Sequence, residues 1–362
     1  MDLSKAFDTV DKDILNKKLH AIGVSDIGCK LMYDYMSNRY IKFSAEGDAY
    51  NLAYGVPQGS ILGPLLFLIY IYDMKNISEE VKSIVYADDT NLVVSGKSVE
   101  EAANKANIIL NKFIDYFNMN KLSLNETKTK YMIFTRQKYS SKKPKIIINE
   151  TELEQVSSIK FLGVVLNDRL NWSDHKTYIK TKISKNIGIL NRCRKILNLN
   201  DILTMYNSFV LPYLSYCLPL WGNSHIPEND IIKKIQNKTL RLISNTKRTQ
   251  KAWAKLSHLK ILPIEDLYKL EVAKVCHNHI YGKLPITFEN NVMPKLSVMM
   301  HTANTRQSTD INYHFDTASK LTMANKSFTA ECVRIWNNIP YDIKRQTSLK
   351  IFSIDFSKKL LE

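Results

Sequence analysis

Two adjacent carboxylates, Asp88 and Asp89, lie between the short apolar runs Ile84-Val85 and Leu92-Val93-Val94. Because β-branched residues favour strands, this pattern predicts a tight β-hairpin with Tyr86-Ala87-Asp88-Asp89 at its tip. Neighbouring side chains on a strand point to opposite faces, so a turn is needed for both carboxylates to face one metal ion. Carboxylate oxygens are hard ligands that suit Mg²⁺. A solvated turn is the alternative interpretation.

Two other segments give this acidic pair a context. One is Met1-Asp2-Leu3-Ser4-Lys5-Ala6-Phe7-Asp8-Thr9-Val10, and the other is Gly55-Val56-Pro57-Gln58-Gly59-Ser60-Ile61-Leu62-Gly63-Pro64. In their order along the chain, these segments and the tetrapeptide at 86–89 resemble the palm of a reverse transcriptase. The motifs are most similar to those of jockey-like non-LTR retrotransposon enzymes. The resemblance implies an RNA-directed DNA polymerase that uses an RNA template, a DNA primer and deoxynucleoside triphosphates.

The resemblance extends over nearly the whole chain. Residues 122–129 and 131–134 are similar to the next motif of the family. The segment Phe161-Leu162-Gly163-Val164-Val165-Leu166 is similar to the element that grips the primer, which implies this role for Phe161, Leu162 and Gly163. Other segments resemble the region on the C-terminal side of the polymerase in such elements: residues 175–197, 211–216, 221–222, 235–238 and 336–340.

The resemblance implies two-metal nucleotidyl transfer, in which two Mg²⁺ ions, or Mn²⁺, grip the attacking and leaving oxygens. Carboxylates from two places in the chain must then converge. We expect Asp2 and Asp88 to be the bridging metal ligands, assisted by Asp89 and the Leu3 carbonyl. Asp8 falls outside the matched metal position and is interpreted as a structural acid.

Four residues match positions around the incoming nucleotide. Phe7 matches the bulky side chain that blocks a 2′-hydroxyl, with a core aromatic as the alternative. Gln58 offers a donor and an acceptor to the sugar or base, and Gly59 allows close backbone approach. Lys128 matches the residue proposed to protonate the leaving pyrophosphate, with a plain surface lysine as the alternative.

The chain is basic, with a formal net charge of +16 and a pI of about 9.4, which suits a polyanionic partner. Most of the excess lies in residues 169–260, which hold 17 Lys and Arg but 4 Asp and Glu. Apolar residues recur there at helical spacing while basic residues occupy the other faces. We expect a thumb that holds a duplex by its phosphates, with a solvated face as the alternative. The expected contacts are Lys176, Lys180, Lys185, Arg192 and Arg194.

These patterns predict an α+β fold with three parts: an antiparallel reverse transcriptase palm at residues 1–166, a basic helical thumb at 167–250 and a C-terminal extension of unknown role at 251–362. Within the palm, Ser98-Val99-Glu100-Glu101 predicts a capping box that opens a long helix. Strands are expected at 131–134, 145–148 and 160–166, with a polar loop at 138–145. Residues 61–72 predict a buried helix, and a further helix is expected at 327–336.

Other features exclude some classes of protein. The five cysteines, at 29, 193, 217, 276 and 332, have no Cys-x-x-Cys spacing, so neither a disulfide framework nor a zinc ribbon is supported. The pair Cys276-His277 with His279 is too few ligands for a closed site. No targeting segment is evident, and the apolar run at 61–72 is too short to cross a bilayer. We expect an intracellular protein of the nucleus or cytoplasm, not a secreted one.

The chain departs from the family pattern at its start, where the catalytic aspartate is residue 2. The fingers that contact the triphosphate in the family are therefore expected to be mostly missing, and an endonuclease domain is not visible. Two hypotheses remain open. The first is a reverse transcriptase polypeptide, and the second is a catalytically inactive remnant that binds nucleic acid. For the isolated chain we expect no measurable polymerase activity.

Overall fold

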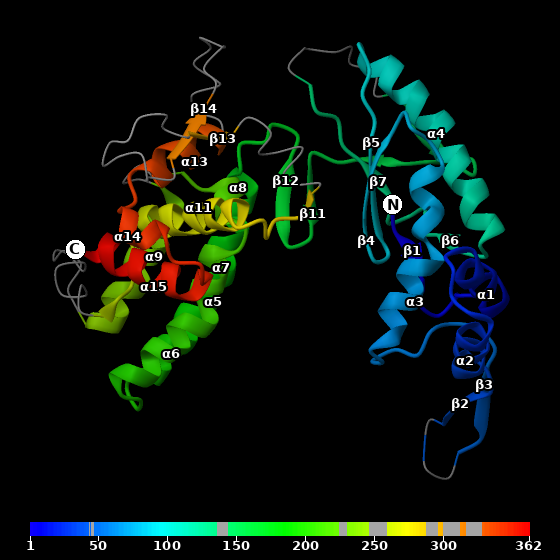
Figure 1. Ribbon diagram of the computed structural model, residues 1–362, viewed down its shortest axis with the longest axis horizontal. Coiled ribbons are helices and arrows are strands. Elements are labelled where there is room, and N and C mark those ends of the chain that lie inside the picture. Colours follow the sequence, from blue (N-terminus) through cyan, green and yellow to red (C-terminus); the bar gives the residue numbers. More distant parts are fainter. Residues whose placement is uncertain are drawn as a thin grey trace. The chain divides into compact units, whose positions relative to one another are not determined.

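The protein is described by a computed structural model that forms two compact units (Figure 1). Described are residues 1–42, 44, 47–135, 144–223, 230–245, 259–286, 296–299, 312–315 and 328–362. The first unit contains Met1–Ile159 and Asn167–Leu170, and the second contains Lys160–Leu166 and Asn171–Glu362. The primer-grip hairpin thus belongs to the second unit, whereas the sequence assigned it to the palm. Most of the expected polar loop, at 138–143, lies outside the described residues.

The first unit mixes helices with short strands, as an α+β fold requires. Its helices are α1 (Lys12–Ala21), α2 (Asp26–Met36), α3 (Leu62–Tyr70), the 3₁₀ helix η1 (Tyr72–Asn76) and α4 (Val99–Met119). Its strands are β1 (Leu3–Ser4), β2 (Arg39–Lys42), β3 (Ala49–Leu52), β4 (Lys82–Tyr86), β5 (Asp89–Val93), β6 (Ser123–Leu124), β7 (Lys130–Tyr131), β8 (Ile147–Ile148), β9 (Thr151–Glu152) and β10 (Glu154–Gln155).

Local sequence explains where the main helices of this unit begin. Asp11 accepts hydrogen bonds from the backbone at the start of α1, and Ser98 accepts one from Glu101 N at the start of α4. Glu101 reaches back to the backbone N–H of Lys97, one residue before the cap. The N-cap expected from the Ser98 motif is therefore confirmed. The buried residues of α4, among them Ile109 and Phe113, form one face that packs in the core.

The run at 61–72 forms α3 and η1, and its burial is one-sided. Leu66, Phe67 and Tyr70 are at most 2% exposed, whereas Leu65 and Leu68 are about half exposed at 52% and 49%. The expectation of a buried helix therefore holds for one face.

The described strand pairings of this unit are antiparallel, as expected for the palm, except for one parallel pair. Among the described residues, backbone hydrogen bonds join the strands of this unit in pairs: β1 with β6, β2 with β3, β4 with β5 and β8 with β9, all antiparallel, and β7 with β10 in parallel. The expected strands at 131–134 and 145–148 are shortened to β7 and β8. Asn149 and Glu150 both have positive φ and turn the chain from β8 directly into β9.

The expected strand at 160–166 is in fact a hairpin, which corrects the sequence interpretation. Strand β11 (Ser158–Phe161) pairs with β12 (Val164–Asn167) across the two-residue loop Leu162-Gly163. Leu162 has φ 43° and Gly163 has φ 84°. Two consecutive residues with positive φ are the geometry that tight hairpin turns require, and glycine adopts it at low cost.

The second unit is mainly helical. Its elements are α5 (Ser173–Cys193), α6 (Leu199–Phe209), α7 (Leu211–Ser215), α8 (Leu218–Trp221), α9 (Ile231–Ser244), α11 (Ile264–Ile280), β13 (Leu296–Met299), β14 (Asn312–Phe315), α13 (Phe328–Asn337), α14 (Tyr341–Lys344) and α15 (Leu349–Leu361). The helix expected at 327–336 corresponds to α13, and Ser327 itself lies outside the described residues.

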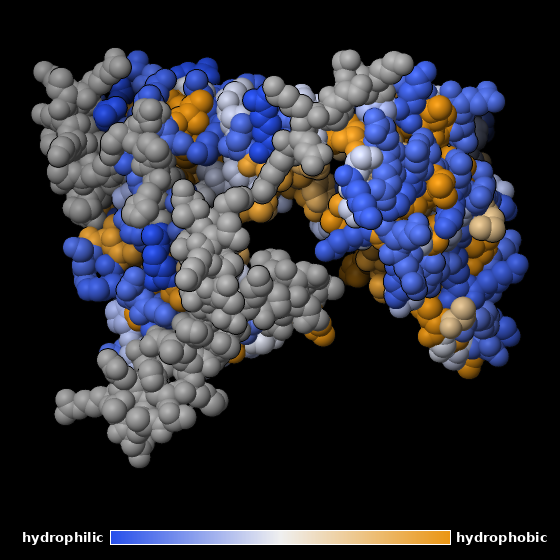
Figure 2. All heavy atoms as spheres, turned by 90° about the horizontal axis from the view of Figure 1, so that it is seen from above, coloured by the Kyte–Doolittle hydropathy of each residue, from blue (hydrophilic) through white to orange (hydrophobic). Residues whose placement is uncertain are grey.

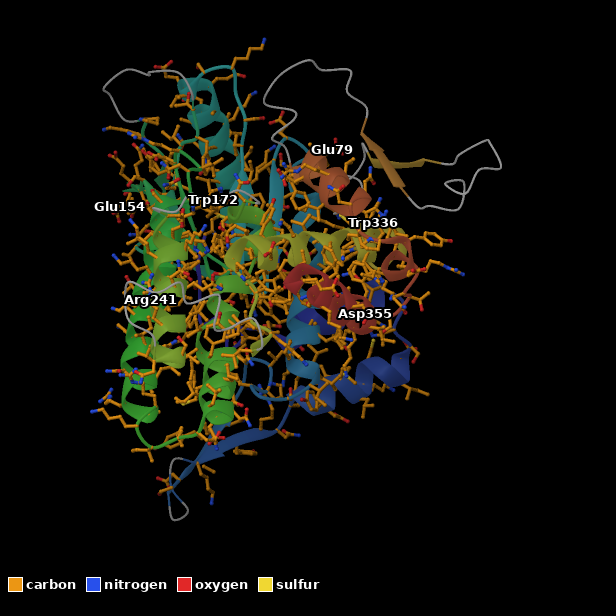
Figure 3. All side chains as sticks on the ribbon, turned by 90° about the vertical axis from the view of Figure 1, so that its left-hand side faces the viewer. Glu79, Glu154, Trp172, Arg241, Trp336 and Asp355 are labelled. Carbon is orange, nitrogen blue, oxygen red and sulfur yellow. The ribbon has the colours of Figure 1, made fainter. Side chains whose placement is uncertain are left out.

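One hydrophobic core joins the expected thumb to the expected C-terminal extension. Ile179, Ile183, Ile187 and Leu190 form the buried stripe of α5, each at most 5% exposed. The same core contains Trp336 of α13, whose ring stacks 5.7 Å from that of Phe352 on α15. Figure 3 labels Trp336 on α13 and Asp355 on α15. These two expected parts therefore fold together as one unit.

Where the described residues are visible, the surface mixes hydrophilic residues with hydrophobic patches (Figure 2). Within the described part of the chain, we find no helix with the length and apolar character needed to cross a membrane.

Candidate active site

The N-terminal segment lies between two other strands of the first unit. The amino group of Met1 donates to the Thr90 carbonyl at 2.6 Å, and Thr90 N–H donates back to the Met1 carbonyl at 3.3 Å. On the other side Leu3 pairs with Leu124 in β6, and Asn125 N–H donates to the Asp2 carbonyl at 2.8 Å. Asp2 is therefore held between β5 and the β6 turn.

The acidic tetrapeptide forms the hairpin that the sequence predicts. In the β4–β5 ladder Tyr86 pairs with Asp89, which leaves Ala87 and Asp88 as a two-residue loop. Ala87 has φ 51°, so the backbone bends between the two strands. Asp88 is half-buried in the loop and Asp89 is exposed at the start of β5. Because Met1 pairs with Thr90, the first acidic segment meets the hairpin next to its tip.

The carboxylates share an electrostatic environment, but they do not form a closed metal site. Burial lowers the pKa of the Met1 amino group, while the charges of Asp2 and Asp89 both act to raise it. Across the described residues, no group of three or more His, Cys, Asp or Glu side chains lies close enough together to hold a metal ion. The donor atoms suit Mg²⁺, and the backbone brings Asp2 beside β5, but the expected set of three is not assembled.

The loop at 55–59 is fixed against the first acidic segment. Gly55 N–H donates to Val10 O and Val56 N–H donates to Phe7 O, both at 2.8 Å. A Cβ on Gly55, which has φ 87°, would lie 2.8 Å from the Asp8 Cα. Glycine is therefore required there for the two backbones to approach each other. Gly55 opens the motif at 55–64, but no pattern in the sequence pointed to this role.

Two of the expected substrate contacts come after Gly55 on the same loop. The Gln58 side-chain nitrogen donates to the Asp8 carboxylate at 2.7 Å, so Asp8 orients the amide as a structural acid would. Gly59 has φ 81°, and a Cβ there would meet no atom within 4 Å, so its backbone faces open space.

Phe7 packs at the edge of the first core, as the alternative interpretation of a core aromatic expected. Its ring lies 4.5 Å from the ring of Phe67, centroid to centroid, at a tilt of 31°. Phe67 is fully buried in the first core, whereas Phe7 is half-buried at its edge. The core therefore fixes the position of the Phe7 ring while leaving part of it accessible.

Lys128 lies near Asp2. Its side-chain nitrogen is 3.6 Å from an Asp2 carboxylate oxygen, and its backbone N–H donates to the Asn125 side chain at 3.2 Å. The turn after β6 therefore places a cation beside the first expected metal ligand.

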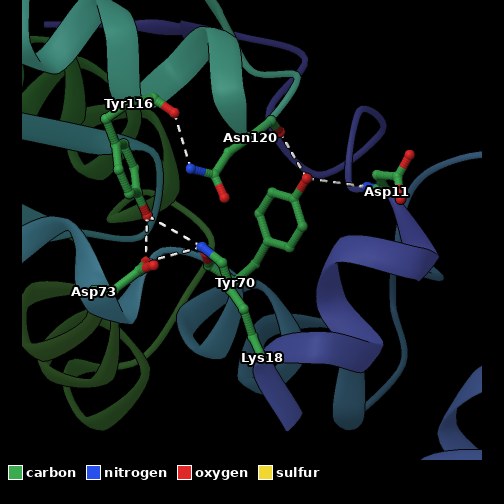
Figure 4. A network of polar contacts seen from close by, with 6 residues as sticks. All are labelled: Asp11, Lys18, Tyr70, Asp73, Tyr116 and Asn120. Carbon is green, nitrogen blue, oxygen red and sulfur yellow. Dashed lines mark hydrogen bonds and ion pairs between the residues drawn. The ribbon is translucent and has the colours of Figure 1, made fainter. Parts of the chain in front are cut away.

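A polar network that is buried at Tyr70 and Asp11 and open to solvent at Asp73 and Lys121 holds the elements around this site (Figure 4). No sequence pattern pointed to it. The Tyr70 hydroxyl of α3 donates to Asn120 O at 2.6 Å and accepts from Asp11 N–H at 3.3 Å. Burial, the largest effect, raises the pKa of Tyr70 to about 12. Asp11 also accepts from the Lys121 ammonium at 2.6 Å. Burial raises the pKa of Asp11, but the Lys121 and backbone hydrogen bonds outweigh it and lower the pKa overall.

The second half of the network joins α1 to η1 and α4. Lys18 donates to the Asp73 carboxylate at 2.8 Å and to the Tyr70 carbonyl at 2.5 Å. The Tyr116 hydroxyl donates to the same Asp73 carboxylate at 2.6 Å. Burial also raises the pKa of Asp73, and the bonds from Lys18 and Tyr116 lower it overall. The helices after the first acidic segment and after the 55–64 loop are thus fixed to one another by polar contacts.

The expected primer-grip and thumb residues lie in the second unit. The Leu162 carbonyl accepts a hydrogen bond from the Tyr216 hydroxyl at 2.7 Å, and the Tyr216 ring packs on Gly163. Phe161 ends β11 and is half-buried. The hairpin turn is therefore held by the residue at the C-terminal end of α7.

The five basic residues expected to bind phosphate divide into two groups. Lys176 forms an ion pair with Asp230, the N-cap of α9, at 2.7 Å, and Arg194 donates to Leu242 O at 3.2 Å. These two side chains hold α5 against α9. Lys180, Lys185 and Arg192 are exposed on α5, and none of them forms an ion pair with another described residue.

Comparison with known proteins agrees with the resemblance seen in the motifs. Residues 1–166 match the family described as "Reverse transcriptase (RNA-dependent DNA polymerase)". This family defines a polymerase palm. The chain therefore carries a reverse transcriptase domain, and its relatives belong to non-LTR retrotransposons of the jockey-like kind.

Two relatives illustrate the similarity. The chain is 32% identical over 259 residues to the "Probable RNA-directed DNA polymerase from transposon X-element" of Drosophila melanogaster, which covers 67% of the chain and 28% of the relative. It is 28% identical over 319 residues to the "RNA-directed DNA polymerase from mobile element jockey" of Drosophila funebris, which covers 82% of the chain and 34% of the relative. The chain thus spans about a third or less of these curated relatives.

Proposed function

We propose that the chain is part of an RNA-directed DNA polymerase, which joins deoxynucleotides to a primer 3′-hydroxyl on an RNA template. The observation that carries this proposal is the pairing of Met1 with Thr90, which brings Asp2 beside the hairpin that bears Asp88 and Asp89. The names of the relatives support a polymerase over a remnant that binds nucleic acid without catalysis.

In this proposal Asp2, Asp88, Asp89 and the Leu3 carbonyl would hold two Mg²⁺ or Mn²⁺ ions. When bound, such ions neutralise the negative charge on the attacking and leaving oxygens. The described conformation does not hold three acidic side chains together. The acidic side chains would therefore have to reorient to hold the ions.

The chain's other residues have roles that their surroundings support. Phe7, fixed on Phe67, excludes a 2′-hydroxyl by its volume. Gln58, oriented by Asp8, presents its amide oxygen to the nucleotide, and Gly59 lets the template or sugar approach the backbone. Lys128 holds the proton that the leaving pyrophosphate takes up.

Primer extension on an RNA template tests the proposal, with the longest in-frame product that contains these residues. We expect extension that requires a divalent cation and that Asp88→Asn abolishes. The control is Asp115→Asn, because Asp115 is an exposed carboxylate on α4 of the same unit and belongs to none of the matched motifs. If Asp88→Asn extends primers as fast as Asp115→Asn does, the metal-ligand assignment is wrong.

A further inference from the structure

A cavity of about 250 Å³ lies within the second unit. It is lined by the hairpin turn at Gly163, by α5 and by α7 with the residue at its C-terminal end. The lining side chains that matter here are His175, Tyr178, Tyr213 and Tyr216. Its volume is close to the lower limit of small-molecule sites, about 300 Å³, so it suits one flat ring system.

The walls of the cavity are aromatic and fixed in place. Tyr216 donates from its hydroxyl to Leu162 O, and its ring lies where a Cβ on Gly163 would be 3.1 Å away. The ring of His175 stacks on that of Tyr178 at a centroid distance of 6.2 Å and an angle of 19°. Since these rings are held by neighbours that are already present, the cavity does not need a ligand to form it.

His175 contributes a buried ring. The side chain is 2% exposed, and its Nδ1 accepts from Val165 N–H at 3.2 Å. Burial lowers the pKa of His175, so the ring is neutral and carries its proton on Nε2. No described residue accepts a hydrogen bond from this Nε2. The ring also lies edge-on to Trp221 at a centroid distance of 5.4 Å, so the core encloses Nε2 and His175 acts as a buried wall of the cavity.

Two cations flank the same wall. The Lys160 ammonium lies 5.0 Å from the centroid of the Tyr178 ring, and the Lys182 ammonium lies 5.6 Å from it. The site thus combines aromatic faces with two cations. A nucleotide has the complementary pair of features: a flat base and a phosphate.

We propose that this cavity binds one unpaired nucleobase of a nucleic-acid strand. The base stacks on the tyrosines and leaves its phosphate near Lys160 and Lys182. The proposal rests on the proposed function, because it assumes a nucleic-acid substrate. The base comes from either the RNA or the DNA strand.

The test is equilibrium binding of duplexes with a single-stranded overhang, in which one overhang nucleotide at a time is made abasic. We expect one abasic position to weaken binding by the parent about fivefold to a hundredfold, the range for loss of one base stacked on an aromatic ring. Tyr213→Ala should bind the intact overhang as weakly as the parent binds that abasic overhang. The variant should be insensitive to the abasic change. Comparing RNA overhangs with DNA overhangs shows which of the two strands supplies the base.

The controls separate stacking from folding. Tyr213→Phe should bind like the parent, and so should Tyr341→Ala, whose tyrosine contacts Arg345 in the same unit. If Tyr213→Ala does not fold, as judged by circular dichroism, Tyr213→Leu fills the space without an aromatic face and should show the same loss.

Two results would overturn the inference differently. If Tyr213→Ala and the abasic change each weaken binding independently, or if neither does, the cavity does not hold a base while the polymerase proposal stands. If the parent binds no duplex at all, both proposals fail.

Discussion

The Lys128 ammonium lies 3.6 Å from the Asp2 carboxylate, although 126 residues separate them in the chain. The pairing of β1 with β6 brings the two segments together, and the turn after β6 aims Lys128 back toward Asp2. Both side chains are accessible, at 31% exposed for Asp2 and 71% for Lys128. A pair this exposed contributes little to stability.

We predict that Lys128→Ala slows primer extension about 100-fold or more, the range for loss of a general acid. The same change should alter the free energy of unfolding by less than about 1 kcal/mol, because the ion pair is exposed. The measurements are single-turnover extension by the longest in-frame product that contains these residues, and thermal unfolding. Lys130→Ala is the matched control, since Lys130 also pairs with an exposed carboxylate, that of Glu154, at 2.7 Å. Equal extension rates for the two variants would mean that Lys128 is a surface lysine with no role in catalysis.

Asp11 offers a test of the polar network. We predict that Asp11→Ala destabilises α1 by about 1–2 kcal/mol, because it removes the N-cap. Asp11→Asn should cost less, since its amide oxygen can still accept from Asp13 N–H and Ile14 N–H. Amide hydrogen exchange of α1 measures the local effect. Exchange that is as slow in Asp11→Ala as in the parent would show that the cap is dispensable.

The same residue predicts how stability depends on pH. The pKa of Asp11 is lower in the folded protein than its ordinary value of 3.8. The carboxylate therefore contributes stability that is present above pH 3.8 and is lost as the pH falls through the lowered folded value. Asp73 acts in the same direction. Protection of α1 should decline below about pH 4 in the parent, and Asp11→Asn should reduce this decline. An identical decline in both proteins would assign it to other carboxylates.

The sequence could predict the features that depend on local pattern. The hairpin at Asp88, the cap at Ser98 and the buried stripe of α5 each arise from residues within a few turns or strand positions of one another. The contacts that assemble the site join residues that are far apart in the sequence. Met1 bonds to Thr90 across 89 positions, Asp11 bonds to Tyr70 across 59 and Lys121 bonds to Asp11 across 110. No periodicity reports such contacts, because they depend on how the core packs.

At Leu162 the local sequence pattern itself gave the wrong structure, because the predicted single strand is a hairpin. A run of β-branched and apolar residues predicts one strand. Gly163 permits a positive φ, and the Tyr216 hydroxyl, 54 positions away, bonds to the Leu162 carbonyl in the turn. The glycine was the available signal, but the tyrosine that stabilises the turn could not be identified from the sequence.

Gly55 is predicted to be the least replaceable glycine near the site. In Gly55→Ala the new Cβ would lie 2.8 Å from Asp8 Cα, and the residue must also keep φ 87°. Gly23→Ala is the control, because Gly23 has φ 91° and nothing within 4 Å. Gly23→Ala should lower the free energy of unfolding by about 1–2 kcal/mol, because alanine is strained in the left-handed conformation. Gly55→Ala should lower it further. Urea unfolding followed by circular dichroism compares them. Equal costs would mean that the loop and the first acidic segment separate easily.

The basic residues of α5 give the last prediction. Lys180 is exposed, whereas the charge of Lys176 is already neutralised by Asp230 at 2.7 Å. If α5 lies along phosphates, Lys180→Gln should reduce the slope of log affinity against log salt concentration by about 0.9, the value for one phosphate contact. Lys176→Gln should change the slope less, because its ammonium is paired in the free protein. Adding Lys185→Gln and Arg192→Gln to Lys180→Gln should bring the reduction to about 2.7. Binding of a duplex across a series of salt concentrations measures the slopes, and a larger effect for Lys176→Gln than for Lys180→Gln would place the phosphates on the α9 side of α5.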